Sequence, residues 1–108
     1  MSMKVLHMHI KARDVIRTFS KQAKREIGES LLKLQLGVNL GMPASRPMTS
    51  ICHGAHELRV KDSAGIYRVF YYLKSEQGIL VFHAFTKKTQ KTVQSEIELG
   101  KKRLKEML

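Results

Sequence analysis

Two arginines near the middle of the chain are spaced so that their charges would meet. Arg59 lies in a run of alternating charged and apolar residues, Arg68 lies in a run rich in β-branched and aromatic residues, and residues 62–65 between them are turn formers. In a tight hairpin the two arginines fall opposite each other on one face. Because adjacent cations repel, such a pair is better explained by a bound phosphate than by packing. The alternative is an ion pair of either arginine with Glu57 or Asp62.

More cations follow the next apolar run. Lys87, Lys88 and Lys91 lie within five residues that include no acid, and Lys61 lies two residues after Arg59. A solvated loop is the usual fate of such a run. Its position at the mouth of the same sheet face favours phosphate contacts instead, so these four lysines are candidates for binding a polyanion.

Alternation across three predicted strands sorts their side chains into two faces. The first face carries the charged set: Glu57, Arg59, Lys61, Arg68, Phe70, Tyr72, His83 and Phe85. The second face is apolar and is the expected seat of the helices: Leu58, Val60, Val69, Tyr71, Leu73, Leu80, Phe82 and Ala84. This register depends on Lys74 pairing with Ile79 around the second turn.

His83 is the histidine that shares the predicted face of the arginines. It is either a packed strand histidine or a general acid or base. No His pair has a strong metal-ligand spacing, and Cys52 is the only cysteine, so neither a Cys-rich zinc site nor a disulfide framework is expected. We expect no metal and no cofactor.

The elements that must position these residues follow an α+β pattern. Strand and helix signals give the order β-α-α-β-β-β-α over a single domain of residues 1–108, with a small antiparallel sheet packed against N-terminal helices and a C-terminal helix. The expected elements are a strand at 4–10, a short helix with Asp14 in its first turn that runs through Phe19, a helix capped by Ser20 that ends at Gly37 or Gly41, a loop at 38–50, strands at 57–61, 66–73 and 79–85, and a helix capped by Thr92 or Ser95 that reaches Met107.

The whole domain is basic. Its 20 Lys and Arg against 9 Asp and Glu give a formal charge of +11, which favours a polyanionic partner such as nucleic acid over a neutral one. Three Tyr, four Phe and no Trp supply a stacking platform for single strands poorly. No apolar run is long enough for a membrane span, and the first residues lack a signal-peptide pattern, so we expect a cytoplasmic protein.

Three segments form a recognisable set: ELRV at 57–60, GIYRVFY at 65–71 and HAFTKKTQK at 83–91, preceded by Leu31, Leu34, Gln35, Gly37 and two prolines. Together they resemble the RelE/HigB toxin superfamily, and in particular its phage-derived branch of HigB-like and Tad-type toxins. The resemblance implies a RelE-like fold and a toxin of a type II toxin–antitoxin module. It further implies a metal-independent mRNA endoribonuclease that acts in the ribosomal A site, with a cognate antitoxin, usually a helix-turn-helix protein, as partner.

The resemblance also suggests roles for individual residues. Arg68 matches the arginine that grips the scissile phosphate, Arg59 matches a basic position on the preceding strand, and Lys87 and Lys88 match a basic pair of which one stabilises the leaving group. Lys61, Lys91, Phe85 and Tyr71 are candidate RNA contacts.

The sequence departs from the RelE pattern at the general base. Glu57 stands where RelE has a lysine, and the C-terminal helix lacks a tyrosine. His83, Glu57 and Tyr71 therefore all stay open as the base. Two other functions also stay open: a protein that binds RNA or the ribosome without cleaving it, and a domain that acts only through its protein partner.

The last helix carries an apolar stripe at Val93, Ile97, Leu104 and Leu108. These residues are expected to be buried, either against the protein's own sheet or under a helix of the antitoxin.

Overall fold

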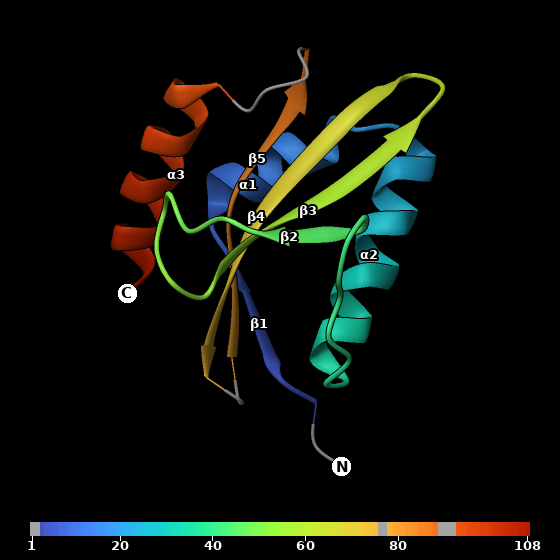
Figure 1. Ribbon diagram of the computed structural model, residues 1–108. Helices are drawn as coiled ribbons and strands as arrows, with labels where there is room; N and C mark the ends of the chain where they lie inside the picture. The colour runs from blue at the N-terminus through green and yellow to red at the C-terminus, as the bar shows by residue number, and fades with distance from the viewer. Residues whose placement is uncertain (1–2, 76–77, 89–92) are drawn as a thin grey trace.

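The computed structural model describes residues 3–75, 78–88 and 93–108 (Figure 1). Its elements are β1 (Val5–Met8), α1 (Ile10–Arg17), α2 (Lys21–Gln35), β2 (Ser45–Pro47), β3 (Ala55–Asp62), β4 (Gly65–Ser75), β5 (Gly78–Lys87) and α3 (Gln94–Met107). The predicted α+β class and element order are confirmed, with one addition. The expected loop at 38–50 contains the short strand β2. A strand of three residues is too short for an alternating pattern to reveal it in the sequence.

The five strands form one sheet in the order β1-β5-β4-β3-β2. β3, β4 and β5 make the predicted antiparallel meander, and β2 pairs antiparallel with β3. The first strand differs, because β1 runs parallel to β5. Parallel neighbours need a long crossover, which α1, α2 and the intervening strands supply here.

Local capping explains where the helices begin. α1 begins four residues before Asp14, because the Nδ1 atom of His9 accepts a hydrogen bond from the amide of Lys11. Ser20 caps α2 as predicted, with its hydroxyl accepting from the Ala23 amide at 3.0 Å. The predicted cap of α3 is wrong at Ser95, which lies inside the helix; the N-cap is Val93, and the other candidate, Thr92, lies outside the described residues.

Gly37 directly follows the C-cap of α2 and has a φ of +90°, a left-handed conformation that favours glycine. The amide of the next residue, Val38, donates to the carbonyl of Lys33 and closes the helix end. Of the two predicted ends of this helix, Gly37 and Gly41, the structure has the one at Gly37.

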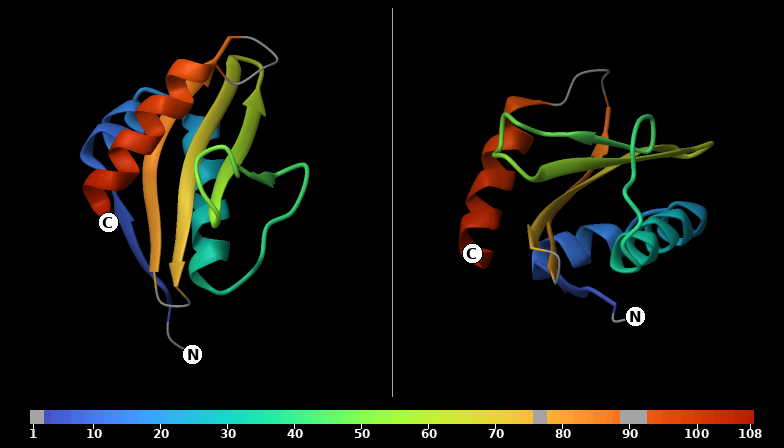
Figure 2. Two further views of the ribbon diagram at one scale, coloured as in Figure 1. Left: turned by 60° about the vertical axis from the view of Figure 1, so that its left-hand side comes forward. Right: turned by 60° about the horizontal axis from the view of Figure 1, so that its bottom comes forward.

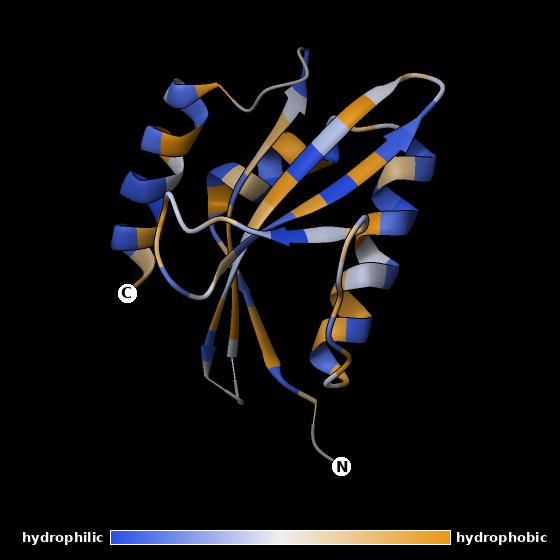
Figure 3. Ribbon diagram, viewed as in Figure 1, coloured by the Kyte–Doolittle hydropathy of each residue, from blue (hydrophilic) through white to orange (hydrophobic). Residues whose placement is uncertain are grey.

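Helices lie over both faces of the sheet (Figure 2), and each face has its own apolar core. α1 and α2 cover one face, and the strand residues packed beneath them include Leu58, Val60, Val69, Tyr71, Ile79, Val81 and Ala84. α3 covers part of the other face, over Phe70, Leu80, Phe82 and Phe85. Hydrophilic and hydrophobic positions alternate along β3 and β4, as Figure 3 shows, which is the pattern of a sheet with two different faces.

A β-bulge in β5 corrects the predicted faces. Phe70 pairs with His83, whereas Tyr71 pairs with Val81, so Phe82 is an extra residue in β5. The bulge reverses the alternation on its N-terminal side. Leu80 and Phe82, predicted under the N-terminal helices, therefore pack in the α3 core. The assumed pairing of Lys74 with Ile79 is wrong for the same reason, since Ile79 pairs with Leu73.

α3 buries only half of its predicted stripe. Ile97 and Leu104 lie in the core, but Val93 and Leu108 are 51% and 66% exposed. Between the buried positions, Gly100 faces Phe70 so closely that a Cβ atom there would lie 3.0 Å from the ring. The helix backbone thus rests almost directly on an aromatic ring of the sheet. None of the described helices is both long and apolar enough to cross a membrane.

Candidate functional site

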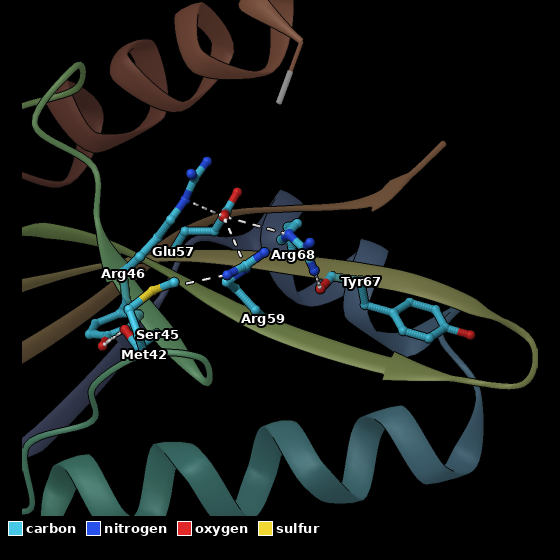
Figure 4. A network of polar contacts seen from close by, with 8 residues as sticks. Met42, Ser45, Arg46, Glu57, Arg59, Tyr67 and Arg68 are labelled. Atoms are coloured by element: carbon cyan, nitrogen blue, oxygen red, sulfur yellow. Dashed lines mark hydrogen bonds and ion pairs between the residues drawn. The ribbon is translucent and has the colours of Figure 1, made fainter. Parts of the chain in front are cut away.

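The site is built around Glu57, a carboxylate whose side chain is completely buried. It lies on β3 on the α3 side of the sheet, and three arginines surround it (Figure 4). Its Oε1 atom lies 2.9 Å from the Nε of Arg46, 3.5 Å from the Nε of Arg68 and 4.0 Å from the Nε of Arg59. One buried carboxylate thus holds three guanidinium groups in place.

Arg46 is the member of this cluster that the sequence analysis missed. It lies on β2, where it is the cross-strand partner of Glu57, and its Nε donates to the Glu57 carboxylate. In the sequence, the only sign of this residue's role is a cation just before Pro47, in a segment predicted to be a loop. Only the pairing of β2 with β3 brings Arg46 to the site.

Arg59 and Arg68 face each other across the β3–β4 hairpin, as predicted. Arg68 is only 6% exposed, and one terminal nitrogen donates to the carbonyl of Tyr67. Burial lowers the pKa of Arg68 from its ordinary value, and Glu57 opposes this shift. Within the described residues, the Nε atoms of both arginines are buried and have no hydrogen-bond acceptor.

The ion pair that the sequence analysis gave as the alternative to a bound phosphate is present, because both arginines pair with Glu57. No ion pair of either arginine with Asp62 is among the described contacts. Asp62 instead accepts from the Ser20 hydroxyl and from the amides of Ala64 and Gly65 in the hairpin turn. These hydrogen bonds, led by the one from Ser20, lower the pKa of Asp62. Asp62 therefore anchors the turn to α2.

The three candidate lysines near the end of β5 differ in position. Lys87 is only 8% exposed, and burial, reinforced by the nearby charge of Arg68, lowers its pKa from its ordinary value. Lys88 is exposed, and Lys91 lies outside the described residues. With Lys87 protonated, the described side chains of the cluster carry four positive charges, from Arg46, Arg59, Arg68 and Lys87, against the carboxylate of Glu57. The net charge of these five described side chains is +3, which favours an anion.

A pocket of about 390 Å³ opens beside the paired arginines. Arg59, Lys61, Ile66 and Arg68 line it from the hairpin, and Pro43 and Ala44 line it from the segment before β2. The predicted candidates Arg59, Arg68 and Lys61 are therefore brought together at one cavity, and none of its described lining residues is acidic.

His83 lies on the face of the arginines but is bonded to α3. Its ring is 2% exposed; its Nε2 lies 2.8 Å from the Glu96 carboxylate, and its Nδ1 lies 2.7 Å from a guanidinium nitrogen of Arg103. Because Nδ1 must accept from Arg103, the ring is neutral and donates from Nε2 to Glu96. Burial lowers the pKa of His83, Glu96 opposes the shift and Arg103 adds to it.

The two aromatic candidates are buried in the protein. Phe85 is the cross-strand partner of Arg68, but it is 7% exposed and packs edge-on against Phe70 at 5.4 Å between ring centroids. Tyr71 lies on the opposite face, 1% exposed, with its hydroxyl 2.6 Å from that of Ser45. The structure does not bring Tyr71 to the pocket. Among the described residues, no three His, Cys, Asp or Glu side chains gather as they would to hold a metal ion.

The sequence matches a known protein family over most of its length. Residues 14–105 match the model of the family described as Phage derived protein Gp49-like (DUF891). Since the match spans most of the chain, the protein belongs to this family, which is a RelE/HigB-like toxin family. The predicted resemblance is thus confirmed.

A solved structure supports the same fold. It is the E. coli toxin RelE, an arginine-to-alanine double mutant in the free state, with a TM-score of 0.53 and 15% sequence identity over 100% of both chains. At this identity the likeness concerns the fold alone. A search of curated proteins gave no match.

Proposed function

We propose that the protein is the toxin of a type II toxin–antitoxin module and that it cleaves mRNA on the ribosome. The family and the RelE-like fold suggest a toxin of such a module. The observation that carries the proposal is the pairing of Arg59 with Arg68 beside an open pocket, over one buried carboxylate. An excess of fixed cations at an accessible cavity suits the pentacoordinate phosphorus of RNA cleavage.

The proposed reaction needs no metal, because RNA supplies its own nucleophile. The ribose 2′-oxygen attacks the adjacent phosphorus, the bond from phosphorus to the 5′-oxygen breaks, and the products are a 2′,3′-cyclic phosphate and a 5′-hydroxyl. One proton leaves the 2′-hydroxyl and one reaches the departing 5′-oxygen. Charge builds on the phosphoryl oxygens and on the leaving oxygen, so cations placed at those atoms accelerate the step.

The cations of the cluster fit these roles. The proposal assigns the phosphoryl oxygens to Arg59 and to the terminal nitrogen of Arg68 that does not donate to Tyr67, since Glu57 faces the Nε atoms of both arginines. It assigns the leaving oxygen to Lys87, whose lowered pKa makes it a better proton donor than an ordinary lysine. Lys61 and Lys88, both exposed, suit contacts with the RNA backbone.

None of the three candidate bases is open to the substrate. Glu57, Tyr71 and His83 are 0%, 1% and 2% exposed, and each is engaged with other side chains. We therefore assign the proton of the 2′-hydroxyl to a group outside these three, on the ribosome or in solvent. Glu57 acts in this proposal as the residue that positions the arginines.

Programmed ribosomes provide the test. The purified protein should cut mRNA in the A site and leave a 2′,3′-cyclic phosphate, detected by mapping the ends of the fragments. Lys87→Ala should slow cleavage more than Lys88→Ala, because only Lys87 lies in the cluster. Arrested translation with intact mRNA would favour the alternative function, a ribosome- or RNA-binding protein without catalysis.

The proposed partners are the ribosome with its mRNA and a cognate antitoxin. Expression of the protein alone should stop growth, and co-expression with a helix-turn-helix protein encoded beside it should restore growth. Binding to ribosomes should weaken steeply with salt, because the lysines and arginines release counterions when they contact phosphates. Normal growth at full soluble expression would contradict the toxin proposal.

A further inference from the structure

Met42 lies beside the arginine pair, and its sulfur faces the guanidinium of Arg59 (Figure 4). The sulfur is 4.0 Å from a terminal nitrogen of Arg59, which donates to it. At 64%, Met42 is also the most exposed of the described methionines. Because a thioether is only a weak hydrogen-bond acceptor, this contact holds the guanidinium weakly.

The backbone around Met42 keeps its side chain close to Arg59. The amide of Ser45 donates to the carbonyl of Gly41 at 3.1 Å, which closes a turn around Met42. The amide of Arg59 donates to the carbonyl of Ala44 at 2.8 Å, which ties the same turn to β3. The short distance from sulfur to guanidinium is therefore set by the main chain as well as by the side chain.

Oxidation of the sulfur would change what Met42 offers to Arg59. A hydroperoxide transfers one oxygen atom to a thioether: the sulfur lone pair attacks a peroxide oxygen, the O–O bond breaks and an S–O bond forms. With hydrogen peroxide, the sulfur is oxidised to the sulfoxide and the peroxide is reduced to water. The sulfoxide oxygen carries partial negative charge, so it accepts a stronger hydrogen bond from a guanidinium than the thioether does.

We propose that Met42 is a modification site at which a peroxide forms the sulfoxide, whose oxygen then binds the terminal nitrogens of Arg59 and competes with anions for them. An effect of this oxidation on mRNA cleavage rests on the proposed function, whereas the contact between Met42 and Arg59 does not. Because methionine sulfoxide reductases restore the thioether, the modification is reversible. Peroxide thus lowers the anion affinity of the site, and the reductases restore it.

Met3 is a matched control within the same chain. It is 50% exposed, and none of the described hydrogen bonds joins its side chain to a guanidinium. Peroxide should therefore oxidise both Met3 and Met42, but only the oxidation of Met42 should affect Arg59. Met48 is 5% exposed and should react more slowly than either.

The test follows the isotope-labelled, full-length protein by NMR before and after treatment with hydrogen peroxide. Dithiothreitol added after the peroxide returns disulfides and sulfenic acid at Cys52 to the thiol and leaves sulfoxides intact, and mass spectrometry of peptides reports the oxidation of each methionine. The side-chain N–H signals of Arg59 should shift on oxidation, because the sulfoxide oxygen replaces a weak acceptor. Unshifted Arg59 signals at full oxidation of Met42 would overturn the proposal.

Titration with inorganic phosphate then measures the effect on the site. Oxidation should weaken phosphate binding roughly three- to tenfold, because Arg59 must give up its hydrogen bond to the sulfoxide before it binds the anion. Methionine sulfoxide reductases specific for the two sulfoxide epimers should together restore the original affinity. Equal phosphate affinity before and after oxidation, or no phosphate binding in either state, would overturn the competition with anions.

Variants assign the effect to one residue. Met42→Leu keeps an apolar side chain that peroxide cannot oxidise, so it should bind phosphate as the wild type does and should not respond to peroxide. Met42→Gln places an amide oxygen beside Arg59 and should bind phosphate about as weakly as the oxidised wild type, without peroxide. Met3→Leu should respond to peroxide like the wild type. A Met42→Leu protein that loses phosphate affinity on oxidation would overturn the assignment to Met42.

These outcomes are distinguishable from failure of the proposed function. A peroxide effect on Arg59 and on phosphate affinity, in a protein that leaves mRNA intact, would keep the modification site and remove the enzyme. Cleavage that peroxide slows equally in the wild type and in Met42→Leu would keep the enzyme and overturn the modification site.

Discussion

On the face that packs against α1 and α2, the strands present a continuous apolar core that includes Leu58, Val69 and Val81. On the opposite face, α3 covers the β5 side, and the β3–β4 hairpin is left to charged residues around Glu57. Both faces are built from alternate residues of the same strands. Two helices thus cover one face of the sheet, whereas the single helix on the other face leaves the β3–β4 hairpin free for the charged cluster.

The separation predicts that the charged face can lose activity without losing the fold. Arg68→Ala should lower the rate of mRNA cleavage by about 10²–10³-fold, because its contact strengthens as charge builds in the transition state. Ribosome binding should fall by a smaller factor. Cleavage rates and binding constants on programmed ribosomes measure the two effects.

Arg17→Ala, on the exposed surface of α1, is the matched control and should leave cleavage near the wild-type rate. Equal losses of binding and cleavage in Arg68→Ala would contradict a transition-state role.

Glu57 is expected to affect both the stability of the fold and the positions of the arginines. Glu57→Gln keeps an oxygen acceptor for Arg46 but removes the charge that balances the cluster. We expect a loss of about 2–3 kcal/mol in the free energy of unfolding, below the usual cost of breaking a buried pair because Arg46 and Arg59 reach solvent. Urea unfolding measures it.

Inorganic phosphate should raise the stability of Glu57→Gln more than that of the wild type, since the anion replaces the missing charge. Glu98→Gln, at an exposed position of α3, should have little effect. A Glu57→Gln protein as stable as the wild type would show that the carboxylate does not hold the cluster.

The helices on the two faces each offer one glycine for comparison. A Cβ atom at Gly28 in α2 would meet nothing within 4 Å, so Gly28→Ala should stabilise the protein by up to about 1 kcal/mol. At Gly100 in α3 the new methyl would press on Phe70, so Gly100→Ala should destabilise it by about 1 kcal/mol or more. Melting temperatures of the two variants should move in opposite directions; a shift of both in the same direction would contradict the close packing of α3.

The attachment of α3 should also depend on pH through His83. Burial lowers the pKa of His83 in the folded protein, so the unfolded chain takes up a proton first as the pH falls below the ordinary value of 6.5. The contribution of His83 to the free energy of unfolding is therefore fully present above pH 6.5. As the pH falls below 6.5 this contribution is lost, by at most about 1.4 kcal/mol per pH unit. His83→Gln, which does not titrate, should lose less stability between about pH 7.5 and pH 5.5. An equal loss in both proteins would exclude His83 as the source.

The parts of this structure that sequence predicted are those set by neighbours in the chain. The turn at 62–65 fixes the register of the hairpin, so the meeting of Arg59 with Arg68 follows from counting residues. Ser20 is found as a cap because capping involves only the next few residues. The family resemblance, which rests on the charged motifs and their order in the chain, predicted the RelE-like fold.

The features that the sequence did not predict depend on contacts between residues distant in the chain, or lie in segments that are apolar almost throughout. The run 79–85 is apolar almost throughout, so nothing in it marks Phe82 as the bulge that reverses the faces. Arg46 lies in a strand of three residues whose existence depends on β3. Glu57 was predicted on the charged face of the sheet, and only the assembled arginines explain why a carboxylate is buried there.

The parallel pair of β1 and β5 has a consequence for how the chain folds. Val5 pairs with Gly78, 73 positions later, whereas the β3–β4 and β4–β5 pairs join segments that are adjacent in sequence. Because closing a long loop costs entropy before any contact repays it, the meander is expected to form first and β1 to dock late. Substitutions in β1 should accordingly speed unfolding while leaving the refolding rate nearly unchanged, which denaturant-dependent kinetics would measure. The first strand of the chain is thus the last to join the sheet.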